Sequence, residues 1–167
     1  ILDHSAPGGI REIPWRFHSR SECLRCHNAW SGIPLTMNSL QLGNGEGSAM
    51  ERLTKLGLMS ANRRDRVRGR RGNDNTPLVN PYSQKHSVTS RARSWLHVNC
   101  GSCHIFGAGG GIQSQFNIGK QLTEARSIEV APARGDFGIT DAKVIASGNP
   151  YHSVVAYRIS TEGAGHM

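Results

Sequence analysis

The chain has 167 residues, of which 37% are hydrophobic, 6% are aromatic and 20 are glycine. This length suits one ordinary domain or two very small ones, and the composition excludes a disordered tail, although so few aromatic side chains leave little for a large core. The sequence contains no run of ~20 apolar residues that could span a membrane, and its formal charge of +8 favours an acidic partner.

Capping patterns predict the first two helices. Ser19 and Glu22 have the spacing of a capping box, so we expect a helix that begins near Ser19 and runs through the first pair of cysteines. Ser48 and Glu51 repeat this spacing, and the apolar residues that follow predict a second helix over about residues 48–59. Long loops rich in Gly, Asn and Pro are expected to connect the helices.

Two further helices are predicted in the second half of the chain. Apolar spacing favours a helix over about residues 88–103, and the Asn-Pro pair at 149–150 is typical of the start of a last helix. Residues 76–81 indicate an extended linker, which divides the chain into a first unit over residues 1–80 and a second over residues 81–167. The sequence therefore predicts a mainly α fold with long Gly-rich loops and little β structure.

Two C-x-x-C-H motifs, one in each half, contain all four cysteines of the chain. They comprise Cys23, Cys26 and His27 in the first half and Cys100, Cys103 and His104 in the second. A c-type haem requires this pattern, because two thiols form thioethers with one edge of the porphyrin and the next residue projects an imidazole onto the iron. The motifs predict two covalently bound haem c groups, with the four cysteines as attachment points and with His27 and His104 as proximal ligands.

Other uses of paired cysteines fit the sequence less well. A four-thiolate zinc site does not need the histidine that follows each pair, and its two pairs are usually separated by only ~15–20 residues. A redox dithiol needs one pair on a βαβ unit, which the sequence does not indicate.

The identity of the second axial ligand of each iron distinguishes the possible functions. A bound side chain favours electron transfer, and a vacant position favours ligand binding or catalysis at the iron. For the second haem we expect Met167, on a Gly-rich loop after the last predicted helix, with His166 as the alternative. For the first haem the candidates are His97, Met59 and Met37. His97 stands close to the second attachment site, so ligation of the first iron by His97 would bring the two irons near each other.

Six short segments follow one another along the chain in a specific order. They read SRSECLRCHNAW, MERLTKLGLM, LVNPY, RARSWLHVNCGSCH, GNPYHSVVAYRI and GHM. This series, over about residues 14–167, resembles the dihaem c-type cytochrome modules of environmental, planctomycete-type bacteria, which are often fused behind a β-propeller or sugar-dehydrogenase-like domain. The resemblance implies two cytochrome c-like units, Met167 as a distal ligand, a second unit without its C-terminal helix, and a periplasmic or otherwise exported protein.

These observations predict a one-electron transfer module that works with a redox protein partner, as a carrier or as the cytochrome part of a larger oxidoreductase. A dihaem peroxidase-like enzyme and a gas-binding sensor with one open haem coordination site are the alternatives. The arginine-rich run over residues 63–71 fits a solvated loop or a docking surface for an acidic partner. Nucleic-acid binding is disfavoured because no aromatic side chains alternate with the arginines.

Overall fold

The computed structural model describes residues 4–11, 17–31, 35–37, 39–43, 46–59 and 77–162. Its regular elements are η1 (Pro7–Gly9), α1 (Arg20–Cys26), α2 (Ser39–Leu42), α3 (Ala49–Lys55), α4 (Val88–Asn99), η2 (Pro150–His152) and α5 (Val154–Ser160). Extended backbone in these residues pairs at two isolated bridges, Ile128 with Ile145 and Lys143 with Ser153. The predicted mainly α fold is therefore confirmed at this level.

The described helices include none that is long and apolar enough to cross a membrane, in agreement with the sequence. Met167, His166 and the arginine-rich run over residues 63–71 lie outside the described residues.

Helices α1 and α3 begin at the predicted caps. The Ser19 hydroxyl accepts a hydrogen bond from the Glu22 amide, and the Glu22 carboxylate accepts one from the Ser19 amide at 2.8 Å, which completes the capping box. The Ser48 hydroxyl accepts a hydrogen bond from the Glu51 amide at 3.1 Å. Helix α3 is shorter than predicted, since it ends at Lys55, just before Gly57 takes a positive φ of 70°.

Helix α4 also ends earlier than predicted, so the second cysteine pair follows the helix instead of lying within it. The amides of Cys100 and Gly101 both donate to the Leu96 carbonyl, at 2.8 and 3.0 Å. A Cβ atom on Gly101 would lie 2.6 Å from the His97 carbonyl oxygen. The chain therefore turns back tightly onto the last turn of α4, which a glycine permits and a larger residue would prevent.

The predicted last helix is divided into η2 and α5. The Asn149 side chain accepts a hydrogen bond from the Tyr151 amide at 3.1 Å, as expected for a cap. The Lys143 amide then donates to the His152 carbonyl at 2.9 Å, and the Val154 amide donates to the Lys143 carbonyl at 2.8 Å. These bonds interrupt the helix, because residues 152–154 pair with another segment before α5 begins.

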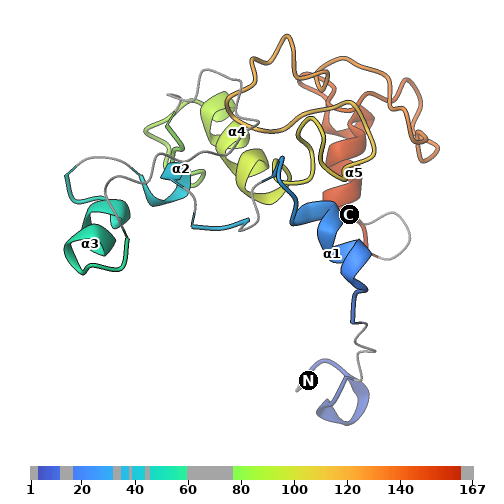
Figure 1. Ribbon diagram of the computed structural model, residues 1–167. Helices are drawn as coiled ribbons and strands as arrows, with labels where there is room; N and C mark the ends of the chain where they lie inside the picture. The colour runs from blue at the N-terminus through green and yellow to red at the C-terminus, as the bar shows by residue number, and fades with distance from the viewer. Residues whose placement is uncertain are drawn as a thin grey trace.

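The core lies between α4 and α5 and is small. Cys100, Phe116 and Val144 form its buried centre, and Trp95, Leu96, Ile145 and Val155 pack around it. Figure 1 shows α4 and α5 connected by long irregular segments, with α1 near the C-terminal end of α4 and with α2 and α3 on the opposite side of the molecule.

The predicted linker is bound to α4 where the structure describes it. The Val79 amide donates to the buried Ser94 hydroxyl at 3.0 Å, and the Arg91 guanidinium donates to the Pro81 carbonyl at 2.6 Å. The two predicted units also touch elsewhere, since the Gly109 amide donates to the Arg25 carbonyl of α1 at 3.0 Å. The division near residue 80 remains a prediction.

Candidate functional site

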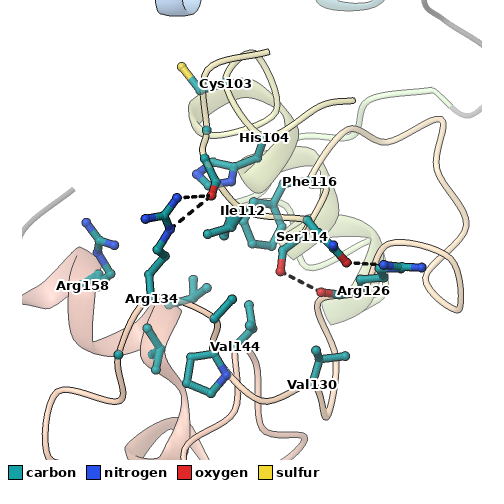
Figure 2. Close-up of a pocket in the computed structure, with 18 of the residues that line it drawn as sticks. Cys103, His104, Ile112, Ser114, Phe116, Arg126, Val130, Arg134, Val144 and Arg158 are labelled. Carbon is teal, nitrogen blue, oxygen red and sulfur yellow. Dashed lines mark hydrogen bonds between the residues drawn. The ribbon is translucent and has the colours of Figure 1, made fainter. Parts of the chain in front are cut away.

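A cavity of about 960 Å³ opens beside the second C-x-x-C-H motif (Figure 2). This volume is near the upper end of the ~300–1,000 Å³ usual for small-molecule sites. Its apolar wall includes Ile112, Phe116, Val130, Val144, Val154 and Val155, and its charged lining residues are Arg25, Arg126, Arg134 and Arg158. Cys103 and His104 also line it, so the cavity joins the second motif to the core.

His104 and Ser114 are the buried polar residues of this wall, and His104 is the one with a titratable ring. It is only 8% exposed, its ring lies 5.1 Å from the Phe116 ring between centroids, and its carbonyl accepts a hydrogen bond from the Phe116 amide at 2.9 Å. Burial lowers the pKa of His104. Its Nδ1 atom is buried and has no hydrogen-bond partner among the described residues. Burial therefore favours the neutral form of this imidazole, which is the form in which histidine binds metals.

The cysteines of the second motif have different surroundings. Cys100 is buried against Phe116 and Val144, which also line the cavity. Cys103 is half-buried, and its thiol is hydrogen-bonded to that of Cys26. Burial and the neighbouring Cys26 raise the pKa of Cys103 to about 12. In Figure 2 the Cys103 sulfur points away from the other labelled lining residues.

Two arginines lie beside each other at one side of the cavity (Figure 2). The Arg134 guanidinium donates to the Gly111 carbonyl at 3.2 and 3.3 Å. The Arg158 guanidinium carbon lies 5.5 Å from the centre of the Phe137 ring, and the buried Arg158 Nε has no hydrogen-bond partner among the described residues. This side of the cavity can therefore receive an anionic group.

The first motif lies on α1 and is more open to solvent. Cys23 and His27 are exposed and Cys26 is half-buried. The His27 amide closes the helix by donating to the Cys23 carbonyl at 2.9 Å. Arg25, between the two cysteines, lines the cavity of the second motif. The structure thus brings the two motifs together at α1, as the contact of Cys26 with Cys103 also shows.

The four thiols do not share one site, because Cys23 is exposed, Cys100 packs in the core, and Cys26 and Cys103 contact each other. Within the described ranges, no group of three or more His, Cys, Asp or Glu side chains converges as a metal cluster. This arrangement disfavours a zinc ion held by all four thiolates, since such a site is tetrahedral with Zn–S distances of ~2.3 Å.

The described distal-ligand candidates lie apart from this cavity. On α4, the His97 Nδ1 accepts a hydrogen bond from the Ile118 amide at 3.2 Å, and His97 does not line the cavity. Met59 is half-buried and follows α3, and Met37 is 63% exposed with a positive φ of 57°. The assignments of His97, Met59 and Met37 to the first haem, and of Met167 to the second, stay predictions.

Sequence analysis did not single out Phe116, Arg134 or Arg158. Phe116 lies in an irregular segment after the second motif, outside any helix. Arg134 comes from a loop and Arg158 from α5. No local pattern could have identified them, because the fold alone brings these separate segments to one cavity.

No family model, curated protein or solved structure matches the chain. The function is therefore argued from the motifs and from the geometry of this cavity.

Proposed function

We propose that this chain is a dihaem c-type cytochrome that transfers single electrons between redox partners. One observation carries the proposal. The histidine of a complete C-x-x-C-H motif, His104, is buried and forms part of the wall of a cavity large enough for a cofactor. The buried Nδ1 atom of this ring has no hydrogen-bond partner among the described residues, although a backbone hydrogen bond with Ser114 acts on the imidazole.

Several features of the cavity suit a haem c, but attachment requires both thiols to turn toward it, because Cys100 does not line the cavity and the Cys103 sulfur points away from the other labelled lining residues in Figure 2. Cys100 and Cys103 precede His104 at the spacing that thioether attachment requires, and Phe116 and Val144 supply an apolar wall that excludes water from the site. Arg134 and Arg158 supply positive charge suited to the two carboxylates of a porphyrin. When bound, the haem supplies a one-electron couple at its iron.

Each of these side chains has a definite task. Phe116 limits the rotation of the His104 ring, because the two rings are in contact and the Phe116 amide is bonded to the His104 carbonyl. Burial lowers the pKa of the His104 imidazole and so favours the unprotonated form that can act as a ligand. The guanidinium groups of Arg134 and Arg158 make the electrostatic potential in the cavity more positive. This potential would disfavour oxidation of a group bound there, because oxidation adds positive charge.

The proposal for the first haem rests on the repeated motif. Cys23 and Cys26 lie one helical turn apart on α1, and His27 follows at the cap of the helix. Cys23 and His27 are exposed, whereas Cys26 is half-buried against Cys103. His97, Met59 and Met37 remain its proposed distal ligands.

Partner and location follow from the same chemistry. The excess of 20 Lys and Arg over 12 Asp and Glu would steer an acidic redox protein, so association should slow as salt increases. Haem c is attached outside the cytoplasm, so we propose a periplasmic or otherwise exported protein. It acts alone or as the cytochrome part of a larger oxidoreductase.

The test is to produce the chain in a host that attaches haem c and to measure its intact mass and its haemochrome spectrum. We expect a mass increased by two haem groups. Replacing Cys23 and Cys26 by Ser, or Cys100 and Cys103 by Ser, should remove one haem each. A bare polypeptide mass from a host that loads a control cytochrome would refute the proposal.

Histidine variants test the ligands. His104→Ala should abolish the low-spin signal of one haem, while His86→Ala, which changes an exposed histidine, should leave both signals intact. Near-infrared spectra of the oxidised protein then distinguish methionine from histidine as distal ligands. A Met167→Ala variant that kept every methionine–iron band would exclude Met167. Binding of carbon monoxide to the reduced wild-type protein would favour the peroxidase-like or sensor alternatives.

A further inference from the structure

The Gly-rich loop after the second motif joins the two motifs through its backbone. The Gly109 amide donates to the Arg25 carbonyl at 3.0 Å, and the next amide, of Gly110, donates to the Cys103 carbonyl at 3.0 Å. Two consecutive amides of this loop are therefore bonded to the carbonyls of Arg25, which precedes Cys26, and of Cys103. This fixes the end of α1 against the turn that follows α4.

Aromatic packing reinforces the same junction. The Trp30 and Phe106 rings meet edge to face with 5.6 Å between their centroids. A Cβ atom on Gly107 would lie 2.5 Å from the Trp30 ring, and one on Gly109 would lie 2.6 Å from the Arg25 carbonyl oxygen. The backbone of this loop thus approaches α1 as closely as glycine allows, and the approach brings the second cysteine of each motif to one place.

The two thiols meet at this junction. Cys26 and Cys103 are both free and half-buried, and their side chains are hydrogen-bonded to each other. The Cys103 sulfur points away from the labelled lining residues of the cavity in Figure 2, which accords with its contact to Cys26. Of the first cysteines of the motifs, Cys23 is exposed, and Cys100 packs in the core while it stays near enough to Cys103 to raise the pKa of that thiol.

We propose that Cys26 and Cys103 are a redox pair that forms a disulfide between the two motifs in the chain before haem is attached. The oxidant is a disulfide of low molecular weight or of an oxidoreductase. The Cys26 thiolate attacks the oxidant and forms a mixed disulfide, and Cys103, whose pKa is raised to about 12, then loses its proton as its sulfur displaces the sulfur of the oxidant that remains bound to Cys26. The two cysteines lose two protons and two electrons, the Cys26–Cys103 bond forms, and the oxidant leaves as two thiols.

This pair has a consequence for maturation that rests on the proposed function. Each motif contributes one of its two attachment thiols, so a single disulfide blocks both haem sites at once. Its reduction then makes both sites available together. An oxidising compartment outside the cytoplasm would favour the blocked form, and a reductant would release it.

The haem-free full chain, produced in a host without haem c attachment, provides the test. The reduced chain is incubated with oxidised glutathione, alkylated and digested without reduction, and the cross-linked peptides are identified by mass. We expect the Cys26–Cys103 peptide to dominate in buffer. In concentrated urea the neighbouring pairs within each motif should dominate instead, because closing a short loop costs less entropy than closing a long one. Dominance of Cys23–Cys26 or Cys100–Cys103 in buffer would overturn the proposal.

Paired variants make the test specific. A chain with Cys23 and Cys100 replaced by Ser retains the proposed pair and should oxidise readily. Its matched control, with Cys26 and Cys100 replaced by Ser, retains Cys23 and Cys103. We expect its intramolecular disulfide to form at least about tenfold more slowly. Equal oxidation rates for the two variants would refute the proposed proximity of Cys26 and Cys103.

A glycine variant tests the junction itself. Gly109→Ala inserts a methyl group against Arg25 and should lower the yield of the Cys26–Cys103 cross-link about tenfold. Gly111→Ala strains a residue of the same loop whose φ is 65°, but its methyl group has its nearest neighbouring atom at 4.0 Å, so it serves as the control for backbone strain without a close contact and should retain the cross-link. Because this assay contains no haem, its failure would leave the mass test of the proposed function unaffected.

Discussion

Replacing Phe116 by Ala should destabilise the chain strongly and release the His104 ring. The Phe116 side chain is 6% exposed, and it belongs both to the core and to the cavity wall. Burial of ~150 Å² of ring surface at about 25 cal/mol/Å² stabilises the fold by about 4 kcal/mol. A compact unfolded chain lowers this to about 3 kcal/mol. The new void merges with an existing cavity, so we expect a loss of about 3 kcal/mol, at the lower end of the ~3–5 kcal/mol typical of such changes.

The assay is urea unfolding of the full chain followed by circular dichroism, with Phe106→Ala as the matched control. Phe106 is 71% exposed, so its truncation should cost only about 1 kcal/mol. In the haem-loaded protein, Phe116→Ala should also broaden the low-spin signal of the second haem, because the ring that limits His104 is gone. Equal losses of unfolding free energy for the two variants would show that Phe116 is not the centre of the core.

Three further changes test separate contacts. Ser94→Ala removes the buried hydroxyl that accepts the Val79 amide, so the free energy of unfolding should fall by about 1–3 kcal/mol in urea titrations, and an unchanged midpoint would contradict this contact. Gly110→Ala places a Cβ atom 3.1 Å from the His104 Nδ1, and we expect a loss of about 1–3 kcal/mol by the same measurement. Hydrogen bonds from Ser147 lower the pKa of Glu129 below 4.5. The ionised Glu129 therefore stabilises the fold fully above pH 4.5, and this stability is lost as the pH falls through the lowered pKa. Glu129→Gln should lower the free energy of unfolding only above this range, and a difference from wild type that persisted at lower pH would refute the assignment.

Local patterns predicted the starts of α1, α3 and α4, and the cap at Asn149, which begins η2 and not α5. The caps at Ser19, Ser48 and Asn149 depend on residues that are neighbours in sequence, so they could be recognised without the fold. The ends of the helices were less predictable. Helix α4 stops at Asn99 because Gly101 turns back on His97, and α5 begins late because His152 and Val154 bond to Lys143.

The candidate site was predictable only at its motifs. The C-x-x-C-H spacing identifies His104 as a ligand candidate by chemistry alone, but burial of His104 depends on Phe116 and on segments far along the chain. The meeting of Cys26 with Cys103 depends on how the Gly-rich loop packs against α1. Such contacts arise from tertiary packing, which no period or cap in the sequence encodes.

Phe116, Val144 and Val155 line the cavity while they also form or surround the core. Whatever fills that space therefore adds to the same apolar contacts on which folding depends, and occupancy shifts the folding equilibrium toward the native chain. Molecules that remain empty would open more often and be cut first by proteases. The shared wall thus couples occupancy of the cavity to the resistance of the chain to proteolysis.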